Sequence, residues 1–160
     1  MFWLFVDGGR STLACMTGLQ RHPLVDTAVR YHQAVGRGAV GEELAGFFHA
    51  DVVQREFPNV LFPDGAVRDL AGILEAAERG RGVLRCQRFD VLNAVAVGDQ
   101  VALEVDWAGT LAVALGDLPS GHVLRARIAV FLEFRDGRIV AQRNYDCYER
   151  SRSVGEREAG

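Results

Sequence analysis

The first half of the chain mixes helical spacing with short breaks. Hydrophobic residues recur every three or four positions from residue 24 to 35, which predicts one amphipathic helix that ends at Gly36. A short second helix is expected after Gly41, and a third after Asp69, whose carboxylate suits the N-cap of a first turn. Between these helices, residues 52–57 alternate as a short strand that a proline stops.

After Gly82 the pattern changes to long strands joined by turns. Strands are predicted over four ranges: 83–97, 101–115, 123–134 and 138–148. Asp136 and Gly137 supply the positive φ that a tight hairpin needs. Helices first and strands last predict an α+β, cone-shaped fold, in which a strongly curved, mostly antiparallel sheet wraps around three N-terminal helices. The helices would leave a cavity on the concave face, and a partly apolar outer face predicts a homodimer.

Composition narrows the class of protein. The 160 residues suffice for one domain with a real core, which we place at residues 23–150. The net charge of −3 argues against nucleic-acid binding, and no run approaches the roughly 20 apolar residues that span a membrane. The three cysteines are far apart and lack metal-binding spacing, which predicts a reduced, cytoplasmic protein.

Both ends of the chain are expected to lie outside that domain. Residues 1–22 begin apolar but lack the features of a signal peptide, so we interpret them as a flexible extension, with Met16 as an alternative start. The alternative interpretation is that the hydrophobic residues 2–5 pack on a partner subunit. The charged residues 151–160 are expected to form a flexible tail.

The last predicted strand ends in a polar and aromatic cluster, residues 142–149, that an ordinary core strand does not carry. Unpaired buried polar groups cost about 1–3 kcal/mol each, so the cluster either faces water or lines a cavity. In a cavity, burial would raise the pKa of Asp146 and suit this residue to general acid–base catalysis. At a solvated rim, Asp146 would instead pair with Arg143 or Arg127.

Other polar residues are candidates for the same site. Glu56 ends the short strand, either as a cavity carboxylate or as a solvated strand end. Glu104 and Asp106 share one strand face, where they form a proton shuttle if that face lines a dry cavity. We assign catalysis to Asp146, Glu56 and Asp106, and substrate contacts to six residues: Tyr31, Gln54, Glu104, Trp107, Asn144 and Tyr145. The histidines are spaced unlike zinc ligands, so no metal is expected.

The order of elements resembles the nuclear transport factor 2-like superfamily, which includes ketosteroid isomerases, limonene-1,2-epoxide hydrolases and SnoaL-like polyketide cyclases. The resemblance runs from about residue 24 to 149 and rests on three segments: Ala28–Val35, Phe48–Pro58 and Phe134–Asp146. It implies the cone-shaped fold, a cavity for a small apolar compound, and no cofactor. Members share this cone and differ in what lines it, so the resemblance implies no single reaction.

The match to two of these groups differs in quality. Against ketosteroid isomerase, Tyr31 matches the oxyanion-hole tyrosine and Glu56 lies close to the catalytic base. The second oxyanion donor should fall near Val130, which cannot donate a hydrogen bond, and this departure counts against steroid isomerisation. The resemblance to the SnoaL-like cyclases meets fewer departures. Those proteins resemble this chain in carrying an acidic residue beside an aromatic one in the last strand, which here are Asp146 and Tyr145.

The site of limonene-1,2-epoxide hydrolase is matched least. The resemblance places the arginine of that site at Glu104 and its second aspartate at Asn144. Only Asp106 keeps the residue type of that site, so the arginine and two aspartates of the hydrolase cannot act together here.

Two functions of different classes fit these residues. The first is a cofactor-independent enzyme of isomerase, cyclase or hydrolase type, in which Asp146 moves a proton on an apolar carbonyl or epoxide compound together with Glu56 or Asp106. The second is a non-catalytic ligand-binding or dimerisation module of the same fold. An enzyme needs at least two ionisable groups that converge on one cavity, whereas a binding module needs only an apolar pocket.

Overall fold

The structure, a computed structural model, describes residues 22–149. Its helices are α1 (Pro23–Gly36), α2 (Gly41–Ala45) and α3 (Leu70–Gly80). Its strands are β1 (Phe48–Glu56), β2 (Ala66–Arg68), β3 (Leu84–Val97), β4 (Gln100–Leu111), β5 (Val123–Arg135) and β6 (Arg138–Tyr148). The extension predicted at residues 1–22 lies, apart from residue 22, outside the described residues, as does the tail at 151–160.

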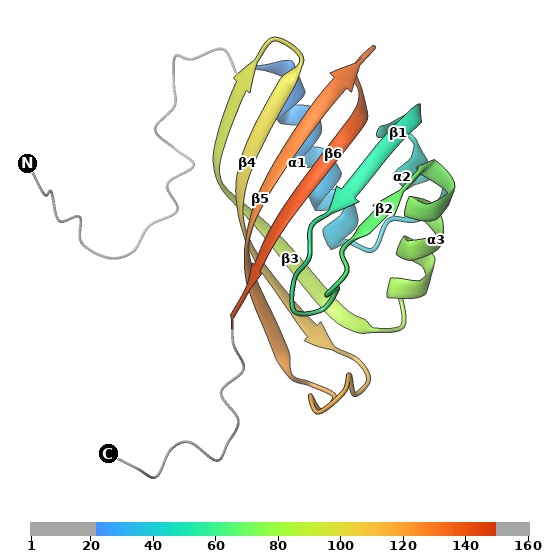
Figure 1. Ribbon diagram of the computed structural model, residues 1–160, viewed down its shortest axis with the longest axis vertical. Coiled ribbons are helices and arrows are strands. Elements are labelled where there is room, and N and C mark those ends of the chain that lie inside the picture. The colour runs from blue at the N-terminus through green and yellow to red at the C-terminus, as the bar shows by residue number, and fades with distance from the viewer. Residues whose placement is uncertain (1–21, 150–160) are drawn as a thin grey trace, which may run out of the picture.

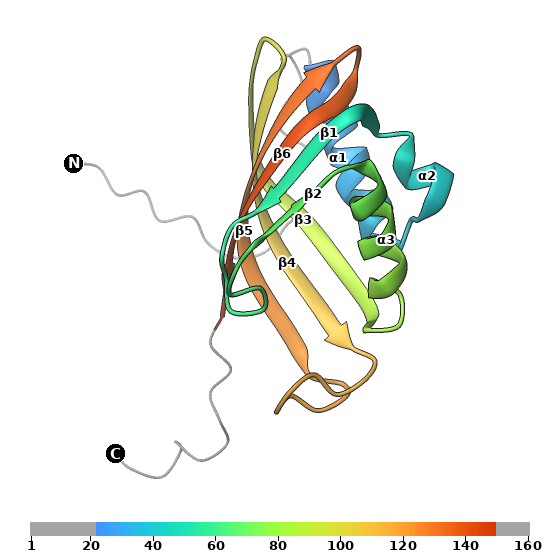
Figure 2. The same ribbon diagram turned by 45° about the vertical axis from the view of Figure 1, so that its right-hand side comes forward.

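The strands form one sheet in the order β2-β1-β6-β5-β4-β3. Strands β3 to β6 make an antiparallel meander, β1 joins β6 in parallel, and β2 pairs with the outer edge of β1. The sheet is curved and unclosed, and all three helices lie on one side of it (Figures 1 and 2). This is the predicted α+β architecture, with a mostly antiparallel sheet wrapped around three N-terminal helices.

The core lies on the concave face that the helices cover. Alternate residues of β4 and β5 are buried, as the period of a strand requires, and the residues between them are more exposed. The inward row packs in one hydrophobic cluster with Ala28 and Tyr31 of α1 and with Ile73 of α3. Burial of one face by helices therefore fixes which side chains can reach the interior.

Local signals in the sequence explain how several elements begin and end. Asp69 caps α3, because its Oδ1 accepts a hydrogen bond from the backbone N–H of Gly72 at 2.9 Å. Asp136 and Gly137 have φ values of 52° and 74°, which gives the tight β5–β6 hairpin and sets its register. No helix of the described part has the length and hydrophobicity needed to cross a membrane.

The observed strands differ from the predicted ones in three places. β1 begins at Phe48, although the hydrophobic pattern predicts this residue in the second helix, because its backbone pairs with Ile139 of β6. β4 ends at Leu111, before the predicted end at residue 115. β2 was not predicted at all, since three residues are too few to show a period, and Gly65 (φ 67°) turns the chain back onto β1.

Candidate active site

The polar end of β6 divides between the two faces of the sheet. Gln142 is buried and Asn144, Asp146 and Tyr148 follow it at alternate positions, so all four belong to the concave row. Contacts agree with this assignment, because Gln142 meets a side chain of α1 and Tyr148 meets the inward-facing Trp107. Only some of the polar residues that the sequence singled out, those at alternate positions of β6, therefore line the inner side of the sheet.

Asp146 is the least satisfied of these side chains. Its Oδ1 is buried and has no hydrogen-bond partner among the residues that the structure describes. Burial raises the pKa of Asp146 to about 6, and the negative charge of Glu56 adds to this shift. Neither Arg143 nor Arg127 neutralises it, because Arg143 pairs with Glu133 at 2.6 Å and Arg127 pairs with Asp106 at 3.7 Å.

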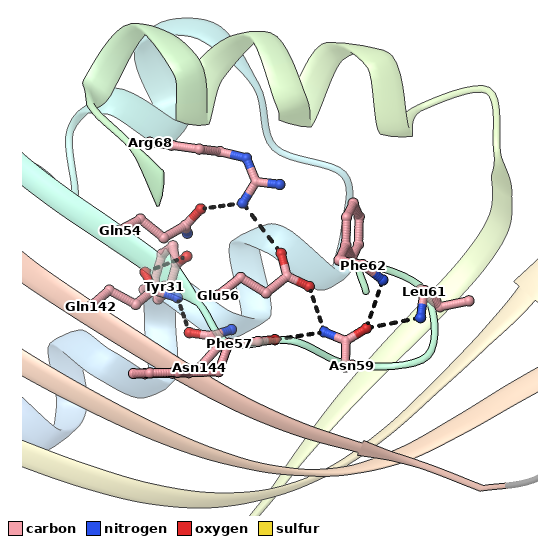
Figure 3. A network of polar contacts seen from close by, with 10 residues as sticks. All are labelled: Tyr31, Gln54, Glu56, Phe57, Asn59, Leu61, Phe62, Arg68, Gln142 and Asn144. Atoms are coloured by element: carbon pink, nitrogen blue, oxygen red, sulfur yellow. Dashed lines mark hydrogen bonds and ion pairs between the residues drawn. The ribbon is translucent and has the colours of Figure 1, made fainter. Parts of the chain in front are cut away.

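Glu56, the second carboxylate of this face, is held from both sides (Figure 3). Arg68 Nη1 donates to Glu56 Oε2 at 3.2 Å and to Gln54 Oε1 at 3.3 Å. Asn59 Nδ2 donates to Glu56 Oε1 at 3.1 Å. The side chains of Arg68 and Glu56 are only 16% and 13% exposed, so their ion pair is well shielded from water.

Strand pairing explains how these groups meet. In the parallel pair of β1 and β6, Glu56 lies beside Asn144, which places it next to the concave row of β6. In the antiparallel pair of β1 and β2, Gln54 lies beside Arg68. The short edge strand β2 thus brings the guanidinium of Arg68 to the end of β1.

Tyr31 connects α1 to the same row of β6. Its hydroxyl donates to Gln142 Oε1 at 3.0 Å, and Gln142 Nε2 donates to Asn144 Oδ1 at 2.8 Å (Figure 3). Burial raises the pKa of Tyr31 to about 12, against the opposing effect of the Gln142 hydrogen bond. Because its one hydrogen already bonds Gln142, Tyr31 has no donor left for a substrate oxygen in this arrangement.

An aromatic wall begins at Tyr148, which shares its face of β6 with Asp146. Tyr148 packs edge-on against Trp107 with ring centroids 5.9 Å apart, and Trp107 lies 6.4 Å from Phe89. Burial raises the pKa of Tyr148 above its ordinary value, and the charges of Asp146 and Glu56 raise it further. The phenol of Tyr148 is therefore a neutral donor beside the Asp146 carboxyl.

A buried histidine completes this wall without joining the chemistry. His32 donates from Nδ1 to the carbonyl oxygen of Ala28 at 2.8 Å, and its ring packs against Tyr31 and Phe89. Burial lowers the pKa of His32, and the hydrogen bond to Ala28 only partly opposes this. His32 is a neutral core residue.

Three of the residues that the sequence suggested face the other way. Glu104 is exposed and Asp106 lies on the same outer face, where it meets Arg88 and Arg127 at 3.7 Å each. Tyr145 stacks on Phe57 and is 42% exposed on that face. The alternation of β4 and β6 separates these three from Asp146, so the proton shuttle predicted for Glu104 and Asp106 has no place in the concave site.

The concave site thus brings together six of the predicted residues: Tyr31, Gln54, Glu56, Trp107, Asn144 and Asp146. Sequence reasoning missed Arg68, Asn59, Gln142 and Tyr148 as members of it. The period of two along β6 could have found Tyr148 from Asp146, whereas Arg68 depends on the unpredicted β2. Val130 is buried at the position next to Asn144, so the second oxyanion donor of a ketosteroid isomerase is absent from this position.

The chemistry of the site follows from one carboxyl with a raised pKa, one fixed ion pair and a neutral phenol. These groups suit proton transfer at an apolar molecule better than metal binding. Within residues 22–149, no group of three or more His, Cys, Asp or Glu side chains is arranged to hold a metal ion.

Comparison with known proteins identifies the family and the fold. A family model described as a SnoaL-like domain matches residues 28–142, and no curated protein matches the chain. IdmH from Streptomyces antibioticus, a proposed polyketide cyclase, is 24% identical with a TM-score of 0.64 over 78% of this chain and 92% of that one. AclR from Streptomyces galilaeus, a proposed hydroxylase, is 18% identical with a TM-score of 0.63 over 78% of each chain. A protein of ketosteroid isomerase-like fold from Catenulispora acidiphila, solved with trimethylamine, is 18% identical with a TM-score of 0.59 over 75% of this chain and 84% of that one.

These structural likenesses establish the fold alone, since one neighbour is a proposed cyclase and another a proposed hydroxylase. The family model covers the chain from α1 to Gln142 of β6, and so includes Glu56 and Arg68 but stops before Asp146. The chain belongs to the SnoaL-like domain family of the nuclear transport factor 2-like superfamily, and it shares the fold of a proposed polyketide cyclase and of a ketosteroid isomerase-like protein.

Proposed function

We propose that the protein is a cofactor-independent acid–base enzyme of the isomerase or cyclase type. It would remove a proton from a carbon next to a carbonyl group in an apolar compound bound against the concave face of the sheet. One observation carries this proposal: the buried Asp146 Oδ1 has no partner among the described residues, in a site where other polar groups are paired.

Asp146 is suited to be the general base. A base works best when its pKa is close to the working pH, and burial together with the charge of Glu56 raises the pKa of Asp146 to about 6. At neutral pH the carboxyl is therefore mostly ionised, yet holds a proton more strongly than an ordinary aspartate. Because Oδ1 has no hydrogen bond to another described residue, it can accept a proton without breaking one.

Tyr148 is the candidate donor to the carbonyl oxygen of the substrate. When Asp146 takes the proton, the C–H electrons move toward that oxygen, and a neutral donor stabilises the enolate that forms. The raised pKa of Tyr148 keeps its phenol protonated. Tyr148 and Asp146 lie two residues apart on the same face of β6, so one substrate could meet both.

Glu56 has a supporting role in this proposal. Arg68 and Asn59 occupy both of its oxygens, so it is poorly placed to accept a proton from a substrate. Its fixed negative charge instead raises the proton affinity of Asp146. We therefore infer that the predicted pair of catalytic carboxylates works as one base and one electrostatic neighbour.

The ligand that fits these walls is apolar and at least partly aromatic. Trp107, Phe89 and Tyr148 form a connected run of rings that begins on the face of β6 shared with Asp146, and the rest of the buried core is aliphatic and aromatic. The neighbouring structures share the fold but differ in proposed activity, so the choice of reaction rests on Asp146 and Tyr148.

Exchange of carbon-bound hydrogen tests the proposal without knowledge of the natural substrate. The bicyclic aromatic ketone 2-tetralone is incubated with the protein in D2O, and loss of its α-proton signals is followed by NMR. The wild-type protein should accelerate exchange above the buffer rate, and Asp146→Asn should abolish the acceleration because a positioned base contributes roughly 100-fold or more. Asp106→Asn is the matched control, since Asp106 lies on the outer face.

Each result of this experiment has a clear meaning. Equal acceleration by wild-type protein and Asp146→Asn would contradict the role of Asp146. Binding of 2-tetralone, seen as shifts in the protein spectrum, with no acceleration by the wild-type protein would instead favour the non-catalytic ligand-binding module.

A further inference from the structure

A cavity of about 440 Å³ opens at the side of the molecule, away from Asp146 and Glu56. It lies between the C-terminal ends of α1 and α3 and the first residues of β3, which is an edge strand of the sheet. Figure 2 shows that the lower part of β3 runs beside the end of α3. The acid–base site proposed above does not use this cavity.

The lining of the cavity combines an apolar body with positive charge. Its apolar part is supplied by six residues: Val35, Ala39, Leu44, Ala76, Ala77 and Leu84. Three arginines line it as well, Arg37, Arg81 and Arg85, and no acidic residue is among the lining side chains. This local positive charge contrasts with the net charge of −3 of the whole chain.

The positive charge is only weakly compensated within the protein. Arg37 pairs with Glu43 at 3.5 Å and Arg81 with Glu78 at 3.4 Å, but all four side chains are more than half exposed. Exposed pairs of this kind contribute little and exchange readily. Arg85 has no ion pair with any residue of the described part.

We propose that this cavity binds an amphipathic anion, with a carboxylate or phosphate group held by Arg81 and Arg85 and an apolar body against α1 and α3. Guanidinium groups bind both kinds of oxyanion in the same forked geometry. A cavity of this volume is within the range of small-molecule sites. The inference goes beyond the proposed acid–base function and does not depend on it.

One side chain of the cavity offers a direct reporter of binding. Gln87 lines the cavity, donates from Nε2 to the carbonyl oxygen of Val35 at 2.9 Å, and accepts from the indole N–H of Trp107 at 3.2 Å. A ligand that contacts Gln87 will therefore change the environment of the Trp107 indole N–H. The sequence contains two tryptophans, so Trp3→Phe leaves a single indole signal.

The test is an NMR titration of ¹⁵N-labelled Trp3→Phe protein with decanoate, decyl phosphate and the neutral decanol. We expect at least one of the two anions to shift the Trp107 indole signal to saturation, with a Kd roughly tenfold below that of decanol. A preference between the two anions tells a carboxylate ligand from a phosphate ligand. Equal binding of decanol, or no saturable shift with either anion, would overturn the proposal.

Two pairs of variants locate the site. Arg81→Gln combined with Arg85→Gln should weaken binding about fivefold or more. Arg79→Gln should not, because Arg79, in the last turn of α3, pairs with Glu75 and does not line the cavity. Gly80 lines the cavity and a Cβ there meets no atom within 4 Å, so Gly80→Leu should crowd the cavity and weaken binding without disturbing the fold. Gly82→Leu, which is equally open but outside the lining, is its control. Equal loss in the variants and their controls would contradict the location.

Discussion

At Asp146, burial and the negative charge of Glu56 both act against the ionised form of the carboxyl. The carboxyl is kept from water and lies near the negative Glu56, and its pKa is raised to about 6. An aspartate in the unfolded chain titrates near pH 3.9, so folding and protonation are linked. The residue that we propose as the base is therefore also one that destabilises the folded protein at neutral pH.

Replacement of Asp146 by asparagine should accordingly relieve this cost. Below pH about 4 the carboxyl is protonated in both states and the penalty is absent. As pH rises to about 6 the unfolded state loses the proton first, so wild-type stability falls, and above that pH the whole cost is present. From pH 4 to pH 8, Asp146→Asn should gain on the order of 1–3 kcal/mol relative to wild type in urea unfolding.

Asp106→Asn supplies the comparison for this stability measurement. Asp106 lies on the outer face near Arg88 and Arg127, so its carboxylate carries no burial cost that an asparagine would relieve. We expect no gain from pH 4 to pH 8 in that variant. A wild-type stability curve that rises from pH 4 to pH 8 as steeply as that of Asp146→Asn would show that Asp146 titrates like a solvated carboxyl.

The charge of Glu56 should be visible in the pH dependence of α-proton exchange. Tyr148, two residues further along β6, stays neutral because its pKa is raised, and Arg68 on β2 contacts Glu56, so Glu56 is the negative charge that acts on Asp146. Glu56→Gln removes the negative charge and keeps an oxygen for Arg68, so the acid limb of the exchange rate, near pH 6 in wild type, should move to lower pH. Glu104→Gln on the outer face should leave it in place, and an unmoved limb in Glu56→Gln would contradict the electrostatic role.

The candidate residues show what the period of a strand can and cannot indicate. Asp146 and Glu56 stand out because a charged side chain at the end of a largely apolar strand is costly to bury unless it is paired or functional. Tyr145 was chosen for being next to Asp146, although the period of a strand places neighbours on opposite faces, and Tyr148 at the alternate position is the residue that shares its face. Glu104 and Asp106 share a face as predicted, but only the packing of the helices decides that this face is the outer one.

Among the elements, β4 depends on a glycine beside the aromatic wall. A Cβ built at Gly109 would lie 2.6 Å from Cζ2 of Trp107, closer than carbon atoms approach. Gly109→Ala should therefore displace the indole that packs on Tyr148, and lower stability by about 1–3 kcal/mol through overpacking. The measurements are the free energy of unfolding and the near-UV circular dichroism of the tryptophan.

Gly80→Ala is the control for this substitution, since a Cβ there meets open space at the end of α3. It should leave both measurements unchanged or slightly raise stability. A Gly109→Ala protein with the stability and spectrum of wild type would mean that the indole does not hold the position described.

The elements themselves were predictable wherever a period extended over several turns or alternations. Helices α1 and α3 and the meander from β3 to β6 follow directly from the hydrophobic spacing. β2 has only three residues and exists because β1 offers an edge, so its guanidinium, Arg68, could not be placed beside Glu56 from the sequence. The polar network of Figure 3 is thus a property of strand pairing.

On the scale of the whole molecule, the outer face of the sheet remains partly apolar. Phe131 and Tyr145 pack edge-on with centroids 5.8 Å apart and are 41% and 42% exposed, and Val53 and Val95 on the same sheet are about half exposed. Exposed apolar patches on a sheet commonly mark an interface between proteins. We propose that this face joins two copies of the chain as a homodimer.

Light scattering after size-exclusion chromatography tests the homodimer. The wild-type protein should elute with twice the mass of the chain, and Phe131→Glu should elute as a monomer because a carboxylate would be buried at the interface. Val60→Glu, at an exposed loop position between β1 and β2, should remain a dimer. A wild-type monomer at all concentrations would refute the proposed interface.

The most direct test of the acid–base site is the titration of Asp146 itself. In protein labelled with ¹³C at aspartate side chains, the carboxyl signal that Asp146→Asn removes is followed from pH 3 to pH 9 by NMR. A midpoint near 6 would agree with a buried, unpaired carboxyl that is poised to accept a proton. A midpoint near the ordinary value of 3.8 would mean that Asp146 is solvated or paired, and would contradict its role as the base.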